Sequence, residues 1–113
     1  MHELALCSSI YEVVDRARGG RVVESVELTV GQLRQVVPET LVACWEVVTA
    51  ETPLAGSALR IDHVPVTLSC PACGTTTGVT DLLVVACRSC GSRAVRVVRG
   101  EEFLVAALEV ADG

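Results

Sequence analysis

Cysteines are the residues of this chain most able to do chemistry, and four of the six form two pairs. Cys70 and Cys73 stand in "CPACG", and Cys87 and Cys90 stand in "CRSCG". The two-residue gap lets both sulfurs of a pair turn toward one ion, and the following glycine relieves the backbone as it folds back. Two such turns offer four thiolates at tetrahedral corners, an arrangement that Zn²⁺ accepts. We therefore predict that these four cysteines bind zinc.

Four sulfur ligands leave no open coordination position, so this zinc ion is predicted to be structural and not catalytic. Two disulfides are one alternative, but cysteines in a chain without a visible export signal favour metal or free thiols. A redox-active dithiol would need only one of the pairs. An iron site of the rubredoxin type uses similar turns, but residues 66–100 contain no aromatic residue to shield a redox centre. We therefore favour zinc.

The first three residues, Met1, His2 and Glu3, form a second candidate metal site. Histidine in second position hinders removal of the initiator methionine, so we expect Met1 to stay. The pKa of a free α-amine is about 7.7–8.0 and that of imidazole about 6.5, so both groups release protons to a metal near neutral pH. With the backbone nitrogens of His2 and Glu3 they can form the planar set that Ni(II) and Cu(II) favour. The alternative is a solvated terminus without chemistry.

The remaining cysteines and the second histidine show no ligand spacing. Cys7 and Cys44 fall within predicted helices, where small buried apolar residues are expected. His63 is predicted on the same strand face as Leu59 and Ile61, so we expect a structural role for it. No Ser-His-Asp or paired-carboxylate arrangement can be placed in the sequence, and we expect that the protein is not an enzyme.

Two amphipathic helices are predicted to position these groups. The first spans about residues 4–18, and Gly19-Gly20 ends it. Its apolar stripe recurs at three- and four-residue steps, at Leu6, Ile10, Val13, Val14 and Ala17. The second helix runs over about 38–50, with Pro38 at the first helical position. Its stripe consists of Leu41, Trp45 and Val48.

Three strands are predicted, at residues 21–31, 58–66 and 101–110. The first has one covered face, formed by Val22, Val26, Leu28 and Val30. Pro65 ends the second strand or places it at an edge. The third is more continuously apolar, which favours a central place in the sheet.

The order of these elements predicts an α+β fold, in which two helices pack on a small three-stranded, mostly antiparallel sheet. The cysteine segment interrupts this order as an inserted zinc-ribbon-like module. We expect residues 1–65 and 101–113 to form one domain, with the candidate metal site at Met1, His2 and Glu3. Residues 66–100 are then the zinc-binding domain.

Charge and length limit the function classes. The chain has 113 residues and a net charge of -5. Residues 66–100 hold four arginines against one aspartate, whereas the other residues hold five arginines against thirteen acids. An acidic body argues against nonspecific nucleic-acid binding. No apolar run of about 20 residues predicts a membrane span, and no secretory signal is visible. We expect a cytoplasmic protein.

Nearly the whole chain resembles the HypA/HybF family of nickel-incorporation metallochaperones for hydrogenase maturation. The resemblance rests on "MHELALC", "VGQL", "VPETLVACWEVVTAETPLAGSAL", "CPACG", "CRSCG" and "EEFLVAALEV", in this order. It implies a nickel site at Met1, His2 and Glu3, with His2 essential, and a structural zinc site at the four paired cysteines. It also implies delivery of nickel to a hydrogenase large-subunit precursor with a GTPase partner, HypB.

Glu39 is the nearest match to an acidic residue that approaches the nickel in some members of that family. Two other function classes are alternatives to the metallochaperone. One is a zinc-ribbon scaffold for protein assembly, and the other is a nucleic-acid-associated module. The acidic body and the absence of stacking aromatic residues oppose the second alternative.

Overall fold

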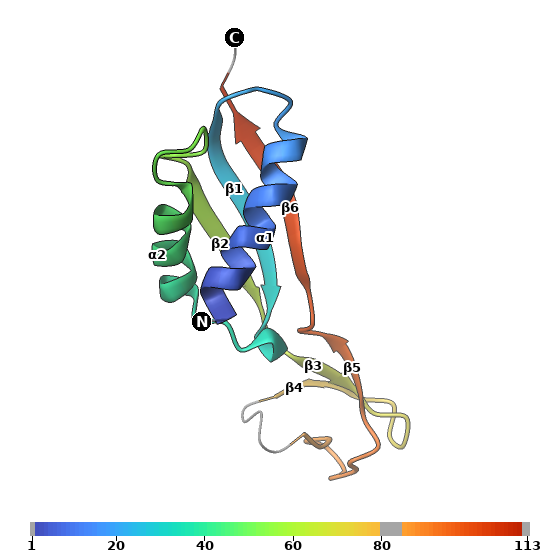
Figure 1. Cartoon of the computed structure of the whole chain (residues 1–113). Helices are drawn as coiled ribbons and strands as arrows, with labels where there is room; N and C mark the ends of the chain where they lie inside the picture. Colours follow the sequence, from blue (N-terminus) through green and yellow to red (C-terminus); the bar gives the residue numbers. More distant parts are fainter. Residues whose placement is uncertain (1, 80–84, 112–113) are drawn as a thin grey trace. The chain divides into compact units, whose positions relative to one another are not determined.

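The structure is a computed structural model that describes residues 2–79 and 85–111, and of His2 only the backbone. Its elements follow the predicted order of helix, strand, helix, strand, cysteine segment and strand (Figure 1). The helices are α1 (His2–Ala17), η1 (Gln32–Arg34, a 3₁₀ turn) and α2 (Pro38–Thr49). The strands are β1 (Val23–Gly31), β2 (Ala58–Val64), β3 (Thr67–Ser69), β4 (Thr76–Gly78), β5 (Arg96–Arg99) and β6 (Phe103–Val110). No described helix has the length and apolar character needed to cross a membrane.

The chain divides into two compact units. The helix unit consists of Met1–Thr29, Val36–Asp62 and Leu104–Gly113, and it contains both long helices. The cysteine unit consists of Val30–Gln35 and His63–Phe103. Each unit is built from segments that are far apart in the sequence.

Helix α1 starts at His2, two residues before the predicted start, and two glycines end it as predicted. Gly19 and Gly20 have φ angles of 58° and 78°, which a side chain would strain. The buried arc of α1 is formed by Cys7, Ile10 and Val14. Val13 was predicted on this stripe but is 49% exposed, and Ala17 is also exposed. The stripe is therefore narrower than predicted, and Cys7 belongs to it.

Helix α2 begins at Pro38, as predicted, and buries every fourth residue: Leu41, Trp45 and Thr49. Val48 is only half-buried. The two long helices pack against each other, and the Cys7 thiol donates a hydrogen bond to the Leu41 carbonyl at 3.3 Å. Apolar spacing of about 3.6 residues thus gives the helix unit its core.

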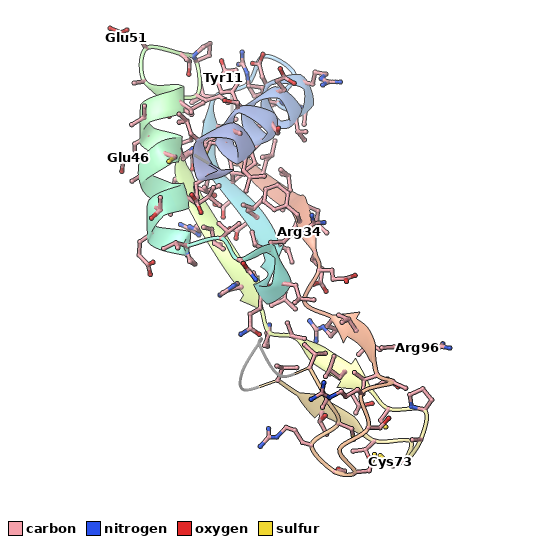
Figure 2. The ribbon with its side chains drawn as sticks, turned by 60° about the horizontal axis from the view of Figure 1, so that its bottom comes forward. Tyr11, Arg34, Glu46, Glu51, Cys73 and Arg96 are labelled. Atoms are coloured by element: carbon pink, nitrogen blue, oxygen red, sulfur yellow. The ribbon has the colours of Figure 1, made fainter. Side chains whose placement is uncertain are left out.

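The sheet of β2, β1 and β6 has β1 in the middle. The β1–β6 pair is antiparallel, because Gly31 N–H donates to Glu102 O and Ala111 N–H to Val22 O. Strands β1 and β2, which are joined through α2, point in the same direction (Figure 2). Strand β6 was expected at the centre and lies at an edge. Its apolar run is not covered on both faces, and Leu104 is 48% exposed.

Strand burial confirms part of the predicted pattern. In β1 the predicted Val26, Leu28 and Val30 are buried, but Val22 precedes the strand and is exposed. In β2, Leu59 is buried, whereas His63 is exposed and does not join it in a core. The strand stops at Val64, directly before the proline, as predicted.

The cysteine unit has its own small sheet, which the sequence pattern did not reveal. Strand β3 lies between β4 and β5 and is antiparallel to both. The three strands are only three or four residues long, too short for a period of two to be recognised. Outside this sheet, the described residues of the unit include the two cysteine turns.

Residues 30–35 are joined to the rest of the cysteine unit by close backbone contacts. Leu33 N–H donates to Gly100 O at 2.8 Å, and Val66 N–H donates to the Gln32 side-chain oxygen at 2.9 Å. A Cβ atom on Gly31 would lie 2.1 Å from the carbonyl carbon and oxygen of Gly100, so only glycine fits. The "VGQL" stretch is therefore a structural part of this unit.

Candidate metal centre

Two turns of the same construction hold the four paired cysteines. In the first turn, Gly74 N–H donates to Cys70 O at 2.7 Å and Cys70 N–H donates to Thr75 O at 3.0 Å. The φ angle of Gly74 is 74°, in the left-handed region where a Cβ atom is unfavourable. The glycine after the pair is thus required by the fold of the turn, as the sequence predicted.

The second turn repeats these bonds residue for residue. Gly91 N–H donates to Cys87 O at 2.8 Å, and Cys87 N–H donates to Ser92 O at 2.8 Å. Gly91 has a φ angle of 78°. Thr75 and Ser92 therefore occupy equivalent places, which the sequence analysis did not single out. Their signal was available, since each directly follows a Cys-x-x-Cys-Gly stretch.

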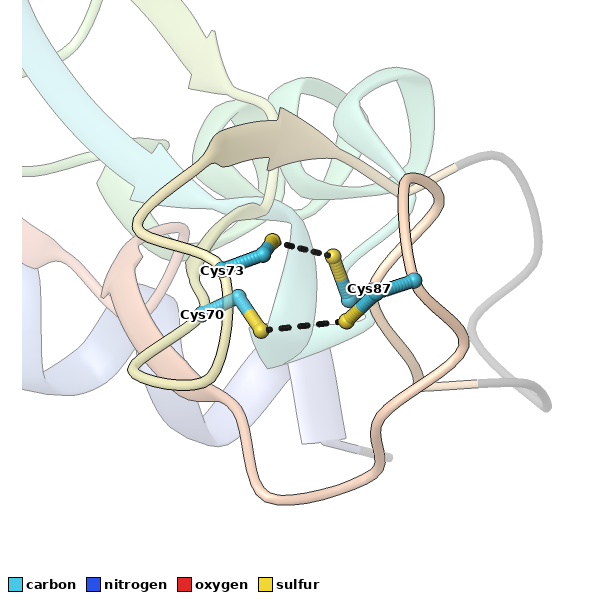
Figure 3. Close-up of side chains that lie close together, drawn as sticks. Cys70, Cys73 and Cys87 are labelled. Carbon is cyan, nitrogen blue, oxygen red and sulfur yellow. Dashed lines mark hydrogen bonds between the residues drawn. The ribbon is translucent and has the colours of Figure 1, made fainter.

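The four sulfurs of these turns converge on one point (Figure 3). Cys70 Sγ lies 3.6 Å from Cys90 Sγ, and Cys73 Sγ lies 3.5 Å from Cys87 Sγ. All four sulfurs lie within 4.8 Å of one another. A tetrahedral zinc ion with Zn–S bonds of about 2.3 Å separates its sulfurs by about 3.8 Å. The cluster therefore has the size and the donor set for a metal such as zinc.

Burial divides each pair in the same way. Cys70 and Cys87, the first cysteines of the pairs, are buried, while Cys73 and Cys90 are exposed. None of the four forms a disulfide. Four protein sulfurs fill a tetrahedral shell, so the arrangement suits a structural ion and provides no place for a substrate.

The thiols differ in their tendency to lose a proton. Hydrogen bonding with the side chain and backbone of Thr75 lowers the pKa of Cys73 to about 6. The Ser92 backbone lowers the pKa of Cys90, but hydrogen bonding with Cys70, desolvation and the other thiols outweigh it and raise the pKa to about 12. Because metal binding needs all four thiolates, it must release protons from this cluster.

Of the predicted nickel-site residues, the structure describes the backbone of His2 and the whole of Glu3, at the start of α1. Met1 lies outside the described residues, and the backbone of His2 forms the first residue of the helix. Glu3 is half-buried in the first helical turn. Glu39 lies in the first turn of α2 and is exposed. Figure 1 shows that α1 and α2 begin at the same end of the helix unit.

The other two cysteines lie where α1 packs on α2. Cys7 is fully buried, as predicted, and Cys44 is half-buried. Burial raises the pKa of Cys7 to about 11, and the charges of Cys44 and Glu3 add to this effect. A thiol with such a pKa stays protonated and suits a core position better than a metal site.

Comparison with known proteins gives one consistent match. The family described as "Hydrogenase/urease nickel incorporation, metallochaperone, hypA" matches residues 1–110. The hydrogenase maturation factor HypA of Geobacter metallireducens is 39% identical over 110 residues, which cover 97% of this chain and 99% of that protein. HypA of Bradyrhizobium sp. is 40% identical over 113 residues, covering 97% of this chain and 99% of that protein.

Two solved structures share the fold. The solution structure of the Ni metallochaperone HypA from Helicobacter pylori has a TM-score of 0.65 and 23% identity, and the match covers 97% of each chain. A second structure, titled "Solution structure of HypA protein", has a TM-score of 0.69 and 23% identity, covering 98% of this chain and 97% of the other. The fold of this chain is thus one already seen in solved structures.

Proposed function

Because this chain belongs to the HypA family of hydrogenase maturation factors, which are nickel-incorporation metallochaperones and not enzymes, we propose that it binds Ni(II) at Met1, His2 and Glu3. The observation that carries the proposal is that α1 begins at His2. The backbone nitrogens that a terminal chelate needs therefore belong to the first turn of a helix.

The first four N–H groups of a helix have no partner within the helix. The amide nitrogens of His2 and Glu3 can therefore give up their protons to a metal without breaking a helical hydrogen bond. Together with the Met1 amine and the His2 imidazole they form a nitrogen set that suits Ni(II). The Glu3 carboxylate offers an oxygen ligand instead.

The position at a helix start also favours release of the ion. The amino end of α1 carries a partial positive charge, which opposes a bound cation. The Glu3 carboxylate offsets part of this opposition. A carrier needs such a balance, because its site must first win nickel and then surrender it.

For the cysteine cluster we propose a structural Zn(II) ion held by Cys70, Cys73, Cys87 and Cys90. Residues 66–100 are then the zinc-binding domain, and residues 1–65 with 101–113 carry the nickel cargo. The sulfur separations support zinc.

We also propose two protein partners, a HypB-type GTPase and the hydrogenase large-subunit precursor, because a role in hydrogenase maturation requires contact with other proteins. The free cysteines are consistent with the reducing cytoplasm as the place of action. The net charge of -5 supports protein partners over nucleic acid or a membrane surface.

The test is a calorimetric nickel titration of untagged protein with a matched pair of histidine variants. His2→Ala should weaken nickel binding at least about 100-fold, because the loss of a chelating imidazole removes several kcal/mol. His63→Ala should leave nickel binding unchanged, since His63 is exposed on β2 and far along the chain from the terminus. Zinc content should be the same in all three proteins. Equal nickel affinity in the His2 variant would refute the proposal.

Two further readouts sharpen this test. Nickel binding should weaken as the pH falls from about 8 to about 6, because protons compete for the amine and the imidazole. A peptide extension at the amino terminus should act like His2→Ala, because it removes the free amine. Unextended protein that takes up zinc but no nickel would instead support the zinc-scaffold alternative.

A further inference from the structure

We propose that a hollow at the carboxyl end of α2 receives a lysine or arginine side chain from a basic, partly apolar segment of a partner protein. This α2 hollow has a volume of about 510 Å³. Its lining comes entirely from the helix unit, from Glu46, Thr49, Ala50, Ala55, Gly56, Ser57 and Ala58. The proposal concerns protein recognition and does not depend on nickel binding.

The hollow exists because the residues around it are small. Three alanines and Gly56 line it, and no bulky side chain extends across it. The φ angle of Gly56 is 85°, and a Cβ atom there would meet nothing within 4 Å. The space is therefore open to an incoming side chain.

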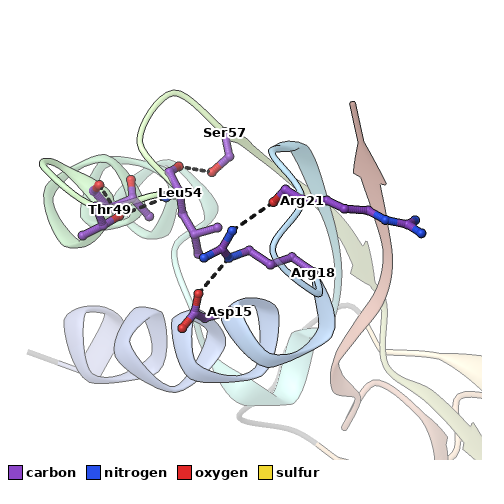
Figure 4. Close-up of polar contacts among 7 residues, drawn as sticks. Asp15, Arg18, Arg21, Thr49, Leu54 and Ser57 are labelled. Atoms are coloured by element: carbon purple, nitrogen blue, oxygen red, sulfur yellow. Dashed lines mark hydrogen bonds and ion pairs between the residues drawn. The ribbon is translucent and has the colours of Figure 1, made fainter. Parts of the chain in front are cut away.

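Hydrogen bonds hold the wall of the hollow in place. Trp45 Nε1–H donates to Ser57 Oγ at 3.0 Å, and the Ser57 hydroxyl donates to Leu54 O at 2.7 Å. The Thr52 hydroxyl donates to Thr49 O at 2.6 Å and accepts from Leu54 N–H at 3.1 Å. Part of this network appears in Figure 4. A wall built in this way loses little conformational entropy when a partner binds.

The negative charge of the hollow favours a positively charged side chain as its occupant. Glu46 is its only charged lining residue, and no ion pair among the described residues involves it. Figure 2 shows Glu46 on the outer side of α2 and Glu51 at the tip of the loop that follows. The carboxyl end of α2 adds partial negative charge. In the sequence, no basic residue occurs between Arg34 and Arg60.

The surface beside the hollow is apolar and exposed, so the partner should place apolar side chains next to its lysine or arginine. Val47, which follows Glu46 in the sequence, is 70% exposed. Ala43 and Ala50, four residues before it and three after it, are also exposed. Residues at this spacing share one helix face. The complementary partner segment therefore carries a lysine or arginine beside apolar residues, as one face of a basic amphipathic helix does.

The probe for this proposal is an amphipathic peptide of leucine and lysine, about 14 residues long. It is titrated into the isotope-labelled full-length protein and followed by amide chemical shifts. We expect shifts concentrated at residues 43–58. Glu46→Gln should raise the dissociation constant about tenfold, because a charge-assisted hydrogen bond is lost. Glu12→Gln, at an exposed position on α1, makes the same change in net charge and should alter it less than about twofold.

A second variant tests the hollow itself. Ala55→Leu should fill it and weaken peptide binding without loss of the amide pattern of α2. Absent binding, equal effects of the two glutamine variants, or equal binding of a leucine–glutamate peptide would overturn the proposal. So would concentration-dependent dimers that Glu46→Gln abolishes, since a second copy would then be the occupant. The same titration with nickel-loaded protein separates this result from the nickel proposal, and we expect no change.

Discussion

The helix unit and the cysteine unit solve the problem of stability in different ways. The helix unit buries large side chains such as Ile10, Leu41 and Trp45 between its helices and its sheet. Among its described residues, the cysteine unit buries few apolar side chains, including Val66 and Leu68, around a sheet of very short strands. A small unit of this kind needs a cross-link to offset the entropy of ordering its chain. From this comparison we expect side-chain packing to stabilise the helix unit and a metal ion bound by the four cysteines to stabilise the cysteine unit.

Charge follows the same division. In the sequence of the helix unit four arginines stand against eleven acidic residues, whereas in that of the cysteine unit five arginines stand against three. Within the helix unit, Arg60 lies 3.7 Å from both Glu27 and Glu109, in a bridge across the sheet. Such exposed pairs contribute little to stability. The helix unit therefore depends on its core, and its spare negative charge is available for recognition.

Metal removal should have the largest effect and should act on one unit only. A chelator, or Cys73→Ala, should release zinc and expose the amides of residues 63–79 and 85–103 to hydrogen exchange. Structural zinc sites supply about 10–16 kcal/mol of apparent binding free energy, which this unit would lose. The amides of α1 and α2 should keep their protection, as measured by exchange and mass spectrometry.

Cys44→Ala is the control for this experiment, because it removes a cysteine outside the cluster. It should leave zinc content and exchange in the cysteine unit unchanged. If chelation unfolded the helices as well, the two units would not be independently stabilised, and the comparison would fail.

A substitution in the core of the helix unit should destabilise that unit and leave the cysteine unit intact, with a smaller loss of free energy than metal removal causes. Leu41→Ala removes a fully buried side chain from the helix unit and should lower its free energy of unfolding by about 2–5 kcal/mol. The measurement is urea denaturation followed by fluorescence of Trp45, the only tryptophan. Zinc content should not change. Val47→Ala, at an exposed position of the same helix, should cost less than about 0.5 kcal/mol.

The smallest expected effect is a pH dependence of the helix unit at alkaline pH. The pKa of Cys7 is raised from 9.0 to about 11 in the folded protein, so the folded state favours its neutral thiol. Titration of Cys7 therefore leaves the free energy of unfolding unchanged below about pH 9. As the pH rises from 9 toward 11, the free energy of unfolding falls by up to about 2–3 kcal/mol. Urea denaturation at several pH values measures this loss. In the Cys7→Ala variant the free energy of unfolding should fall less between pH 9 and 11. An equal fall in the variant would show that the pH dependence does not come from the Cys7 thiol.

Local spacing explains which parts of the structure the sequence predicted. The four paired cysteines and their glycines lie within turns of five residues, so their geometry is encoded in short stretches. Pro38 likewise marks the start of α2 without help from distant residues. Both features were predicted because no tertiary contact is needed to specify them.

Long-range packing explains what the sequence did not predict. The place of β6 at the sheet edge depends on which strands pair, and its apolar composition gave the wrong answer. Val13 and His63 fit a periodic pattern, yet both are exposed, because the pattern does not show how wide the covering surface is. The link from Trp45 to Ser57 closes over twelve residues and has no sequence signature.

The backbone contacts of residues 30–35 decide how the cysteine unit could be transplanted. The longer continuous piece of this unit is His63–Phe103. A designer who excised only this piece would lose Gln32, whose side chain accepts a hydrogen bond from Val66 N–H, and Gly31, which lies against the backbone of Gly100. In the transplanted unit, Val66 N–H would then have lost its hydrogen-bond acceptor, and Gly100 would have lost the backbone that packs against it. A portable version has to be assembled from two pieces of chain, with the short piece that contains Gly31 included.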